Sequence, residues 1–393
     1  MTGAPDAIAP GKPHLSVRLA WGAACLSVAV IAVGVGLDRQ ARDVPSLAAI
    51  VPSGFRGYAQ ESLVEQALVS GKDKAATLAE AKELLRRRPI PAEHLTLLSQ
   101  AAYAAGDAGL SDTALMFSAG RGWRDVLTQK AMVGAAMASG QPDIAVARLT
   151  ALWDIGVRSD LVTNETAAVI SDATARKGFA REVAVNSDWN DAFLTWGMTN
   201  LPTQAYAQTV SAAIDAGAQF DCQRLSAVAN AMARAGIVEA AKLVWRGSCA
   251  GKAGATSADP FVLAPQQWGR EQGPFDWDYP QAAGLSVTFR EQDGQSVMDY
   301  VNTDALTHVV ARRYSELAAG TYALSALGEL PTGSALVLRV RCVAEGGVQG
   351  GVVRLPLSAD AASFNIPSEG CPAQLLELVV ARGKGTGIRL VRK

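Results

Sequence analysis

The sequence predicts a multidomain α plus β protein: a single transmembrane helix, an α-solenoid and a C-terminal antiparallel β-sandwich. Three observations predict this fold class. Residues 19–37 are apolar or small and carry no charge. From about Ser62 to Cys249, apolar residues recur every three or four positions, which is the helical period. Beyond Pro274 they alternate, which is the period of a half-buried strand.

The apolar run 19–37 lies between Arg18 and Asp38. A helix rises about 1.5 Å per residue, so nineteen residues reach across the roughly 30 Å hydrocarbon core of a bilayer. A cleaved signal peptide is the alternative, because Gly34 and Gly36 form a small-x-small site. Signal peptides usually have shorter apolar regions of about 7–15 residues, and this favours a retained anchor.

The expected domain limits follow from these changes of pattern. We expect a disordered cytoplasmic tail at 1–17, an anchor at 18–38 and a linker at 39–61. These are followed by an α-solenoid at 62–249, a second linker at 250–274 and a β-sandwich at 275–393. The tail contains three prolines, and the second linker begins with the small, polar run AGKAGATSADP.

Four cysteines outside the apolar run form two local pairs, Cys222 with Cys249 and Cys342 with Cys371. Neither pair has the short C-x-x-C spacing of a metal site. Each pair lies within one expected structural unit, which favours two disulfides and therefore an oxidising compartment. The alternative is four buried free thiols. We expect the anchor to place a short tail inside and the body outside the cytoplasm.

Glycine closes several of the helical runs. Gly71, Gly106, Gly140 and Gly178 are spaced by 35, 34 and 38 residues, and a glycine after a helix can adopt the left-handed conformation that ends it. A further helix pair is expected at 221–249, around Gly236. Between Gly178 and Gly236 the sequence shows no such register.

A helix pair about every 34 residues resembles the tetratricopeptide family, chiefly over residues 62–178. The resemblance implies an α-solenoid in which each pair packs against the next. It also implies a surface that binds peptides or protein partners.

The C-terminal third predicts eight or nine short strands separated by turn signals such as Asp293-Gly294 and Gly346-Gly347. Within residues 335–342, the inward positions are expected to be Leu336, Leu338, Val340 and Cys342, with Arg339 and Arg341 outward. Such strands favour an antiparallel sandwich of the jelly-roll type, with the proline at 356 on an edge strand.

No catalytic or metal-binding motif appears in the sequence. The three histidines are dispersed, and no Walker loop, G-x-S-x-G or H-E-x-x-H motif is present. Residues 383–387 (GKGTG) look like a phosphate loop, but a turn between strands is favoured because no helix follows. Asp276 and Asp278 suit alternate exposed positions better than a calcium site, which takes about 6–8 oxygen ligands. A net charge of −1 argues against nucleic acid as a partner.

Three residues are candidates for glycan binding. Trp277 is a candidate for stacking on a sugar ring, and Arg389 and Arg392, in the basic C-terminal strand, are candidates for contacting an anionic glycan. The alternatives are a core position for Trp277 and a solvated sandwich face for the two arginines.

The segments Phe275-Asp276-Trp277 and Cys371-Pro372-Ala373-Gln374 resemble a family of bacterial envelope TPR proteins associated with polysaccharide export. Together with the architecture, they imply a scaffold without enzymatic activity or cofactor, anchored once in the bacterial inner membrane through residues 19–37. Its periplasmic body would bind envelope proteins through the solenoid, in envelope or exopolysaccharide assembly or export. The alternative is a glycan-binding accessory protein that acts through the sandwich.

Overall fold

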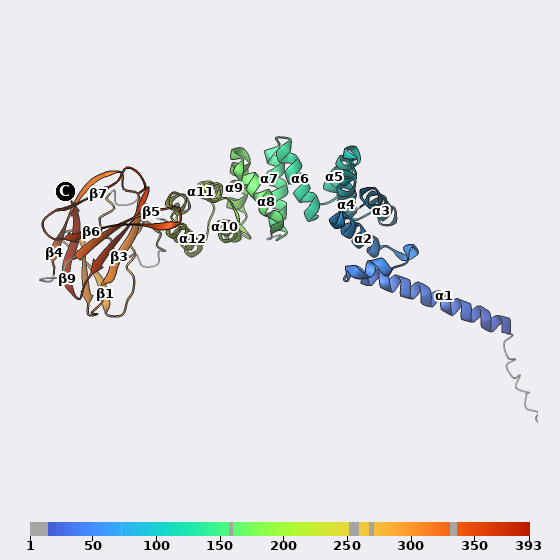
Figure 1. The fold of residues 1–393 in the computed structure, drawn as a ribbon, viewed down its shortest axis with the longest axis horizontal. Coiled ribbons are helices and arrows are strands. Elements are labelled where there is room, and N and C mark those ends of the chain that lie inside the picture. The colour runs from blue at the N-terminus through green and yellow to red at the C-terminus, as the bar shows by residue number, and fades with distance from the viewer. Residues whose placement is uncertain (1–14, 72, 157–159, 251–258, 267–270, 331–335) are drawn as a thin grey trace, which may run out of the picture. The chain divides into compact units, whose positions relative to one another are not determined.

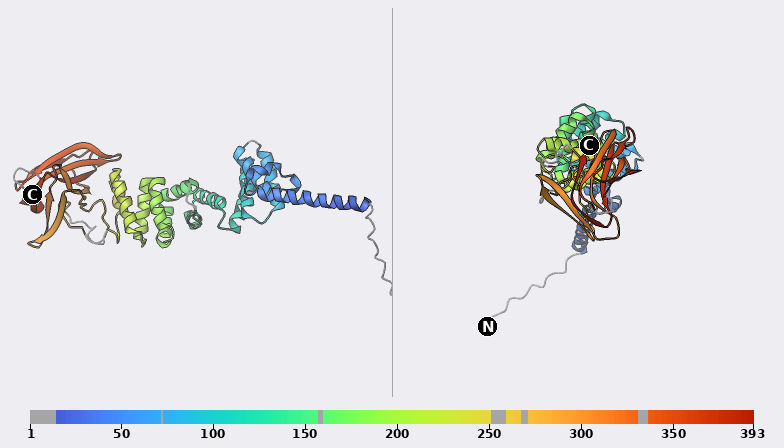
Figure 2. Two further views of the ribbon diagram at one scale, coloured as in Figure 1. Left: turned by 90° about the horizontal axis from the view of Figure 1, so that it is seen from below. Right: turned by 90° about the vertical axis from the view of Figure 1, so that its left-hand side faces the viewer.

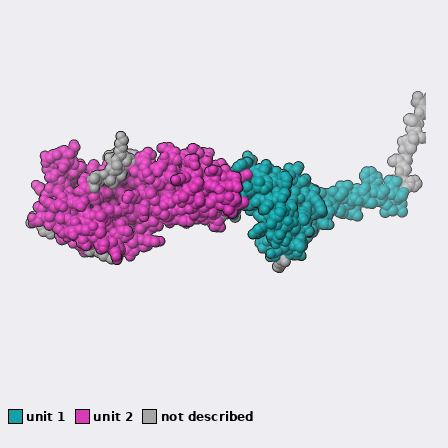
Figure 3. All heavy atoms as spheres, turned by 90° about the horizontal axis from the view of Figure 1, so that it is seen from above, with its two compact units in different colours: residues 1–132 teal, residues 133–393 magenta. Residues whose placement is uncertain are grey.

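A computed structural model describes residues 15–71, 73–156, 160–250, 259–266, 271–330 and 336–393. The chain divides into two compact units, Met1–Met132 and Val133–Lys393, which Figure 3 colours separately. The predicted tail up to residue 14, and residues 251–258 and 267–270 of the predicted second linker, lie outside the described residues.

The apolar segment forms one long helix, α1 (Leu15–Gln40) (Figure 1). Among the described residues, it alone is long and apolar enough to cross a bilayer. The helix begins three residues before the expected anchor, so residues 15–17 are helical and do not belong to a disordered tail. It ends at Gln40, two residues beyond the expected limit.

Helices continue in antiparallel succession after α1. In the first unit these are α2 (Tyr58–Ser70), α3 (Lys74–Arg87), α4 (Ala92–Ala104) and α5 (Ala108–Arg121), and α6 (Val126–Ala138) crosses into the second unit. The second unit continues with α7 (Pro142–Asp154), α8 (Asp160–Ser171), α9 (Ala173–Val185), α10 (Asn190–Asn200), α11 (Thr203–Asp215), α12 (Cys222–Arg234) and α13 (Val238–Val244).

The period of the helical pairs confirms the expected repeat and extends it. The first helices of successive pairs begin 34, 34, 34, 30 and 32 residues apart, from Tyr58 to Cys222. Gly71, Gly106 and Gly140 all have positive φ and end α2, α4 and α6, as predicted. The register does not disappear after Gly178, as the sequence suggested, but shortens by a few residues through the pair α10–α11.

Gly178 is the exception among the predicted helix ends, because it lies inside α9. A Cβ atom added there would be 3.2 Å from the Val146 side chain on α7. This glycine therefore lets two helices approach each other. The turn between α8 and α9 is made by Asp172 instead, whose carboxylate accepts hydrogen bonds from the amides of Thr174 and Ala175 at 2.9 and 2.8 Å.

Residues 39–61, expected as a linker, are folded in the first unit. They form two short 3-10 turns, η1 (Pro45–Ile50) and η2 (Ser53–Phe55), and then the first turn of α2. Ala41, Ala48, Val51 and Ala59 make a small fully buried core with the end of α1. The carboxylate of Asp38 accepts the amides of Gly57, Tyr58 and Ala59 at 2.7, 3.1 and 2.9 Å. The last turn of α1 thus caps the N-terminus of α2.

The C-terminal strands form two antiparallel sheets packed as a sandwich (Figures 1 and 2). One has the order β1-β2-β9-β4-β7, and the other β3-β8-β5-β6. The strands are β1 (Leu285–Gln292), β2 (Gln295–Asn302), β3 (His308–Ser315), β4 (Gly320–Glu329), β5 (Leu336–Ala344), β6 (Gly347–Leu357), β7 (Ala362–Ile366), β8 (Ala373–Val380) and β9 (Gly383–Arg392). The proline at 356 lies on β6, an edge strand, as predicted.

Two segments of the sandwich differ from the sequence expectation. Phe261 and Leu263, placed in the second linker, are buried in the sandwich core. Residues 383–387 are the first half of β9, so they form neither a turn nor a phosphate loop. The reason is steric: a Cβ at Gly385 would be 2.2 Å from the ring of Tyr300, so glycine lets β9 pass over that ring beside β2.

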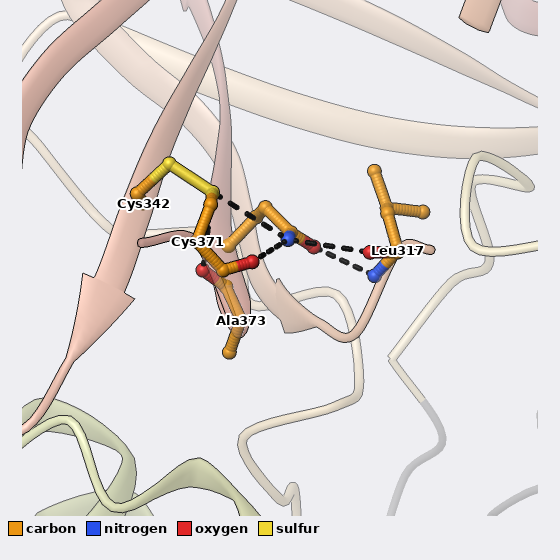
Figure 4. The surroundings of a disulfide bond; sticks show 5 residues. Leu317, Cys342, Cys371 and Ala373 are labelled. Atoms are coloured by element: carbon orange, nitrogen blue, oxygen red, sulfur yellow. Dashed lines mark hydrogen bonds between the residues drawn. A yellow bond between two sulfur atoms is a disulfide. The ribbon is translucent and has the colours of Figure 1, made fainter. Parts of the chain in front are cut away.

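Both predicted disulfides are present, Cys222–Cys249 and Cys342–Cys371. The first joins the start of α12 to a turn five residues beyond the end of α13, slightly later than the helix end that was expected. The second links β5 to the segment leading into β8 (Figure 4). Beside it, the buried amide of Gln374 accepts from the Leu317 N–H at 2.6 Å and donates to the Cys371 carbonyl at 3.0 Å.

The sandwich packs directly on the last helical pair within the second unit. Val238 of α13 shares a buried cluster with Val343, Ala373 and Leu375 of the sandwich. The N–H of Gly346, in the β5–β6 turn, donates to the carbonyl of Ala235 at 3.1 Å. Gly236 has a φ of +85°, and a Cβ there would be 1.6 Å from the carbonyl oxygen of Ala344. This position therefore excludes any side chain.

We predict that Gly236→Ala separates the β5–β6 turn from the last helical pair. Gly217→Ala is the matched control, because Gly217 ends α11 with a φ of +100° and a Cβ there meets nothing within 4 Å. Both changes cost about 1–2 kcal/mol for the left-handed backbone. Only Gly236→Ala adds the clash, worth a further ~1–3 kcal/mol. Hydrogen exchange should show loss of protection at the Gly346 amide in this variant alone. Equal protection in both variants would contradict the prediction.

Candidate functional site

Two cavities border the junction between the last helical pair and the sandwich. The first, the α13 cavity, holds about 420 Å³. Its lining includes Lys242, Trp245, Phe275, Glu316, Tyr322 and Arg392. The second, the α12 cavity, holds about 390 Å³ and is lined by residues that include Asn230, Arg234, Asp278 and Arg312. Asp276, Arg313 and Tyr314 line both cavities.

Arg313 is the centre of this arrangement. It occupies an inward position on β3 and is only 8% exposed. Its guanidinium donates to the carbonyl of Pro260 at 3.1 Å and lies 5.7 Å from the ring centre of Trp277. Burial lowers the pKa of Arg313, and the nearby carboxylates of Asp276 and Asp259 oppose that shift. Both carboxylates belong to the segment that precedes the strands, so this segment favours the cationic form of Arg313.

Trp277, the sequence candidate for sugar stacking, does not present its ring to solvent. It is 4% exposed and belongs to the sandwich core, beneath the guanidinium of Arg313. The core position that was the alternative is the one the structure shows. The neighbouring carboxylates do not form a pair either. Asp278 binds Arg312 at 2.8 Å, and Asp276 accepts the amide of Gly273 at 2.9 Å.

Arg389 and Arg392 lie on β9 but do not form one basic patch. Arg392 lines the α13 cavity, with its guanidinium carbon 4.9 Å from the ring centre of Tyr322. Arg389 donates to the side chain of Gln295 and lines a separate cavity of about 250 Å³ with Arg290 and Glu329. The two positions differ by an odd number of residues, so they point toward opposite faces of the strand.

The α13 cavity offers cations beside aromatic rings. Lys242 pairs with Glu316 across the junction, and the rings of Trp245, Phe275 and Tyr322 supply apolar surface. A cavity of this size can hold a small ligand or one unit of a polymer. Neither described histidine lines it: His94 contacts Glu61 in the first unit, and His308 contacts Asp304 at 2.9 Å.

Within the described ranges, no group of three or more His, Cys, Asp or Glu side chains is placed to hold a metal ion. Sequence reasoning missed Arg313, Lys242, Trp245 and Tyr322, which come from β3, from α13 and its C-cap, and from β4. One signal was available for Arg313, because alternation along β3 places it between the buried residues Ala311 and Ser315.

The chain was compared with known proteins. No protein-family model matches it, and no curated protein sequence matches it.

Proposed function

We propose that this protein is a scaffold of the bacterial envelope, held in the inner membrane by α1, with its helical pairs and sandwich in the periplasm. The observation that carries the proposal is the packing of the end of α1 into the folded body. An apolar helix that is part of the native packing is retained, whereas a signal peptide is removed.

Two contacts at the end of α1 support a retained helix. The buried Gly34 faces the ring of Phe55, and a Cβ there would be 2.7 Å from that ring. One helical turn later, Asp38 accepts three amides at the start of α2. Cleavage near Gly36 would remove the first contact and leave Asp38 two residues from a frayed end.

The two disulfides support an extracytoplasmic body. Disulfides persist in oxidising compartments and are rare in the cytosol. Each disulfide has one buried cysteine, Cys249 in the first and Cys371 in the second.

We predict that the mature protein retains α1. Intact mass of protein extracted from membranes with detergent should include residues 19–37, because their removal would open the core around Ala48 and Val51. Alkaline carbonate washing, which strips peripheral proteins, should leave the protein in the membrane pellet. A mature N-terminus near Gly36 would refute the anchor.

The helical pairs are the proposed partner-binding element, in envelope or exopolysaccharide assembly or export. Stacked helical pairs present an extended surface, and such surfaces commonly bind proteins. In the first unit, the pair α4–α5 exposes three large apolar side chains, those of Tyr103, Met116 and Phe117. Exposed aromatic side chains are frequent anchors of protein interfaces. The proposal assigns no catalytic step, cofactor or nucleic-acid partner to the chain.

We predict that Phe117→Ser reduces partner binding at least tenfold, which corresponds to about 1.4 kcal/mol. Phe117 is 63% exposed, so its replacement should not disturb the fold. The matched control is Val185→Ser, at an exposed apolar position on α9. Envelope proteins cross-linked to the full chain in native membranes would be quantified for each variant. An unchanged set of cross-linked proteins in Phe117→Ser would place the binding surface elsewhere.

Glycan binding by the sandwich is the second candidate function, and the α13 cavity is the observation that favours it. Arg392 over Tyr322 combines a cation with an aromatic ring at the mouth of a cavity of about 420 Å³. A carboxylate-bearing sugar fits such a pair, because the cation contacts the acid and the ring contacts the sugar.

We predict weak binding of acidic polysaccharide, with a millimolar dissociation constant, equivalent to about −4 kcal/mol. Arg392→Ala should abolish this binding, whereas Arg389→Ala, on the opposite face of the same strand, should preserve it. Calorimetric titration of the full chain in detergent with an acidic and a neutral polysaccharide tests both variants. Equal losses in the two variants would indicate nonspecific charge attraction, and equal binding of both polymers would exclude the arginine as the determinant.

A further inference from the structure

The segment between α1 and α2 contains twelve consecutive residues without charge, from Val44 to Phe55 (VPSLAAIVPSGF). Apolar segments of this length are too short to span a bilayer and are typical of buried cores or interfacial segments. The structure folds this one as the 3-10 turns η1 and η2.

The segment packs back along the last turns of α1. Phe55 contacts Gly34, which precedes the first charged residue, Asp38, by four positions. At about 1.5 Å per residue, the Phe55 ring therefore lies roughly 6 Å deeper along α1 than Asp38. If residues 19–37 lie in the membrane, then Phe55 lies at the level where the headgroups meet the acyl chains.

Only some of the apolar side chains of this segment are buried in the protein core. Ala48 and Val51 are fully buried against the end of α1, but Ile50 is 62% exposed and Val44 is 47% exposed. These exposed side chains lie on a segment packed against the end of α1, where Val33 and Val35 are also exposed. An apolar surface that adjoins a membrane-spanning helix is best covered by lipid.

Arginines flank the segment. Arg39 and Arg42 follow the apolar part of α1 and are exposed, and Arg56 follows Phe55 directly. Arg87 of α3 donates to the carbonyls of Ser53 and Arg56, which holds the basic end of α3 against η2. Two carboxylates nearby are engaged, Asp38 by three amides and Glu83 by Arg86 and Arg87 at 3.3 and 2.9 Å, whereas Asp43, between Arg42 and Val44, is exposed.

We propose that residues 44–55 form a foot that inserts into the leaflet from which α1 emerges, and that Arg39 and Arg42 contact its anionic phospholipid headgroups. The inference depends on the proposed anchoring of α1. An apolar segment flanked by Arg39, Arg42 and Arg56 matches the acyl chains and the neighbouring phosphates of that leaflet. The foot would hold the first helical pair against the membrane surface.

The test uses the full chain in vesicles and an environment-sensitive fluorophore on a single free cysteine. The native free cysteine, Cys25, lies within α1 and reports on the anchor. In a Cys25→Ser background, Ile50→Cys reports on the foot. Val69→Cys, at a 90% exposed position at the end of α2, is the matched control. Nitroxide-labelled lipids and a water-soluble quencher then locate each label.

We expect lipid quenching of the labels at 25 and 50, and aqueous quenching of the label at 69. If the label at 25 is in lipid but the labels at 50 and 69 are equally aqueous, the foot is refuted and the anchor stands. If the label at 25 is itself aqueous, the anchor fails and the foot fails with it.

Lipid charge tests the arginines. Replacing neutral phosphatidylcholine with phosphatidylglycerol should increase lipid quenching at 50 about twofold. Arg39→Gln/Arg42→Gln should remove that increase. The control Lys74→Gln/Lys82→Gln, which removes the same charge from exposed positions on α3, should retain it. An increase that survives in the arginine variant, or is lost equally in both, would overturn the headgroup contact.

Discussion

In each unit, a helical pair has an apolar face open at one end, and the neighbouring part of the chain closes that end. In the first unit, the end of α1 and the turns η1 and η2 cover α2, with Asp38 capping its amides. In the second unit, the β5–β6 turn and the start of β8 cover α13 around Val238. Each end is therefore closed by the neighbouring part of the same chain, not by a dedicated capping helix.

Both closures require backbone to approach backbone or a ring, which is why glycine stands at the contact points. Gly34 admits the ring of Phe55, Gly57 admits the carboxylate of Asp38, and Gly236 admits the carbonyl of Ala344. Contacts of this kind fix the position of each closing segment on its helical pair, because no long side chain lies between them that could change its conformation. In the proposed scaffold, these contacts would hold each closing segment at a defined place on its own helical pair.

The same closure creates the candidate site. Packing the sandwich against α12 and α13 brings the cations of Lys242, Arg313 and Arg392 beside the rings of Trp245 and Tyr322. Lys242 and Trp245 come from the end of α13, whereas Arg313, Tyr322 and Arg392 come from three strands of the sandwich. The sequence candidates followed local composition, so they found Arg392 in a basic strand and left Trp277 between a sugar-stacking position and the core position that the structure shows. The residues around a tryptophan that precedes a strand look the same whether its ring is exposed or buried in the core.

The sequence by itself determined the apolar helix, the helical pairs, the two-residue period of the strands and both cysteine pairings. These features depend on the period of apolar residues and on the short spacing of the cysteines, and both can be recognised within a short stretch of sequence. Arg339 and Arg341, for example, face outward as alternation requires and bind Glu377 at 3.4 and 3.0 Å. Only the tertiary structure decided that residues 39–61 fold against α1, that Phe261 enters the sandwich core, and that Arg313 is buried between two cavities. Those outcomes depend on contacts between segments far apart in the chain, and no local period encodes which distant surface a residue will meet.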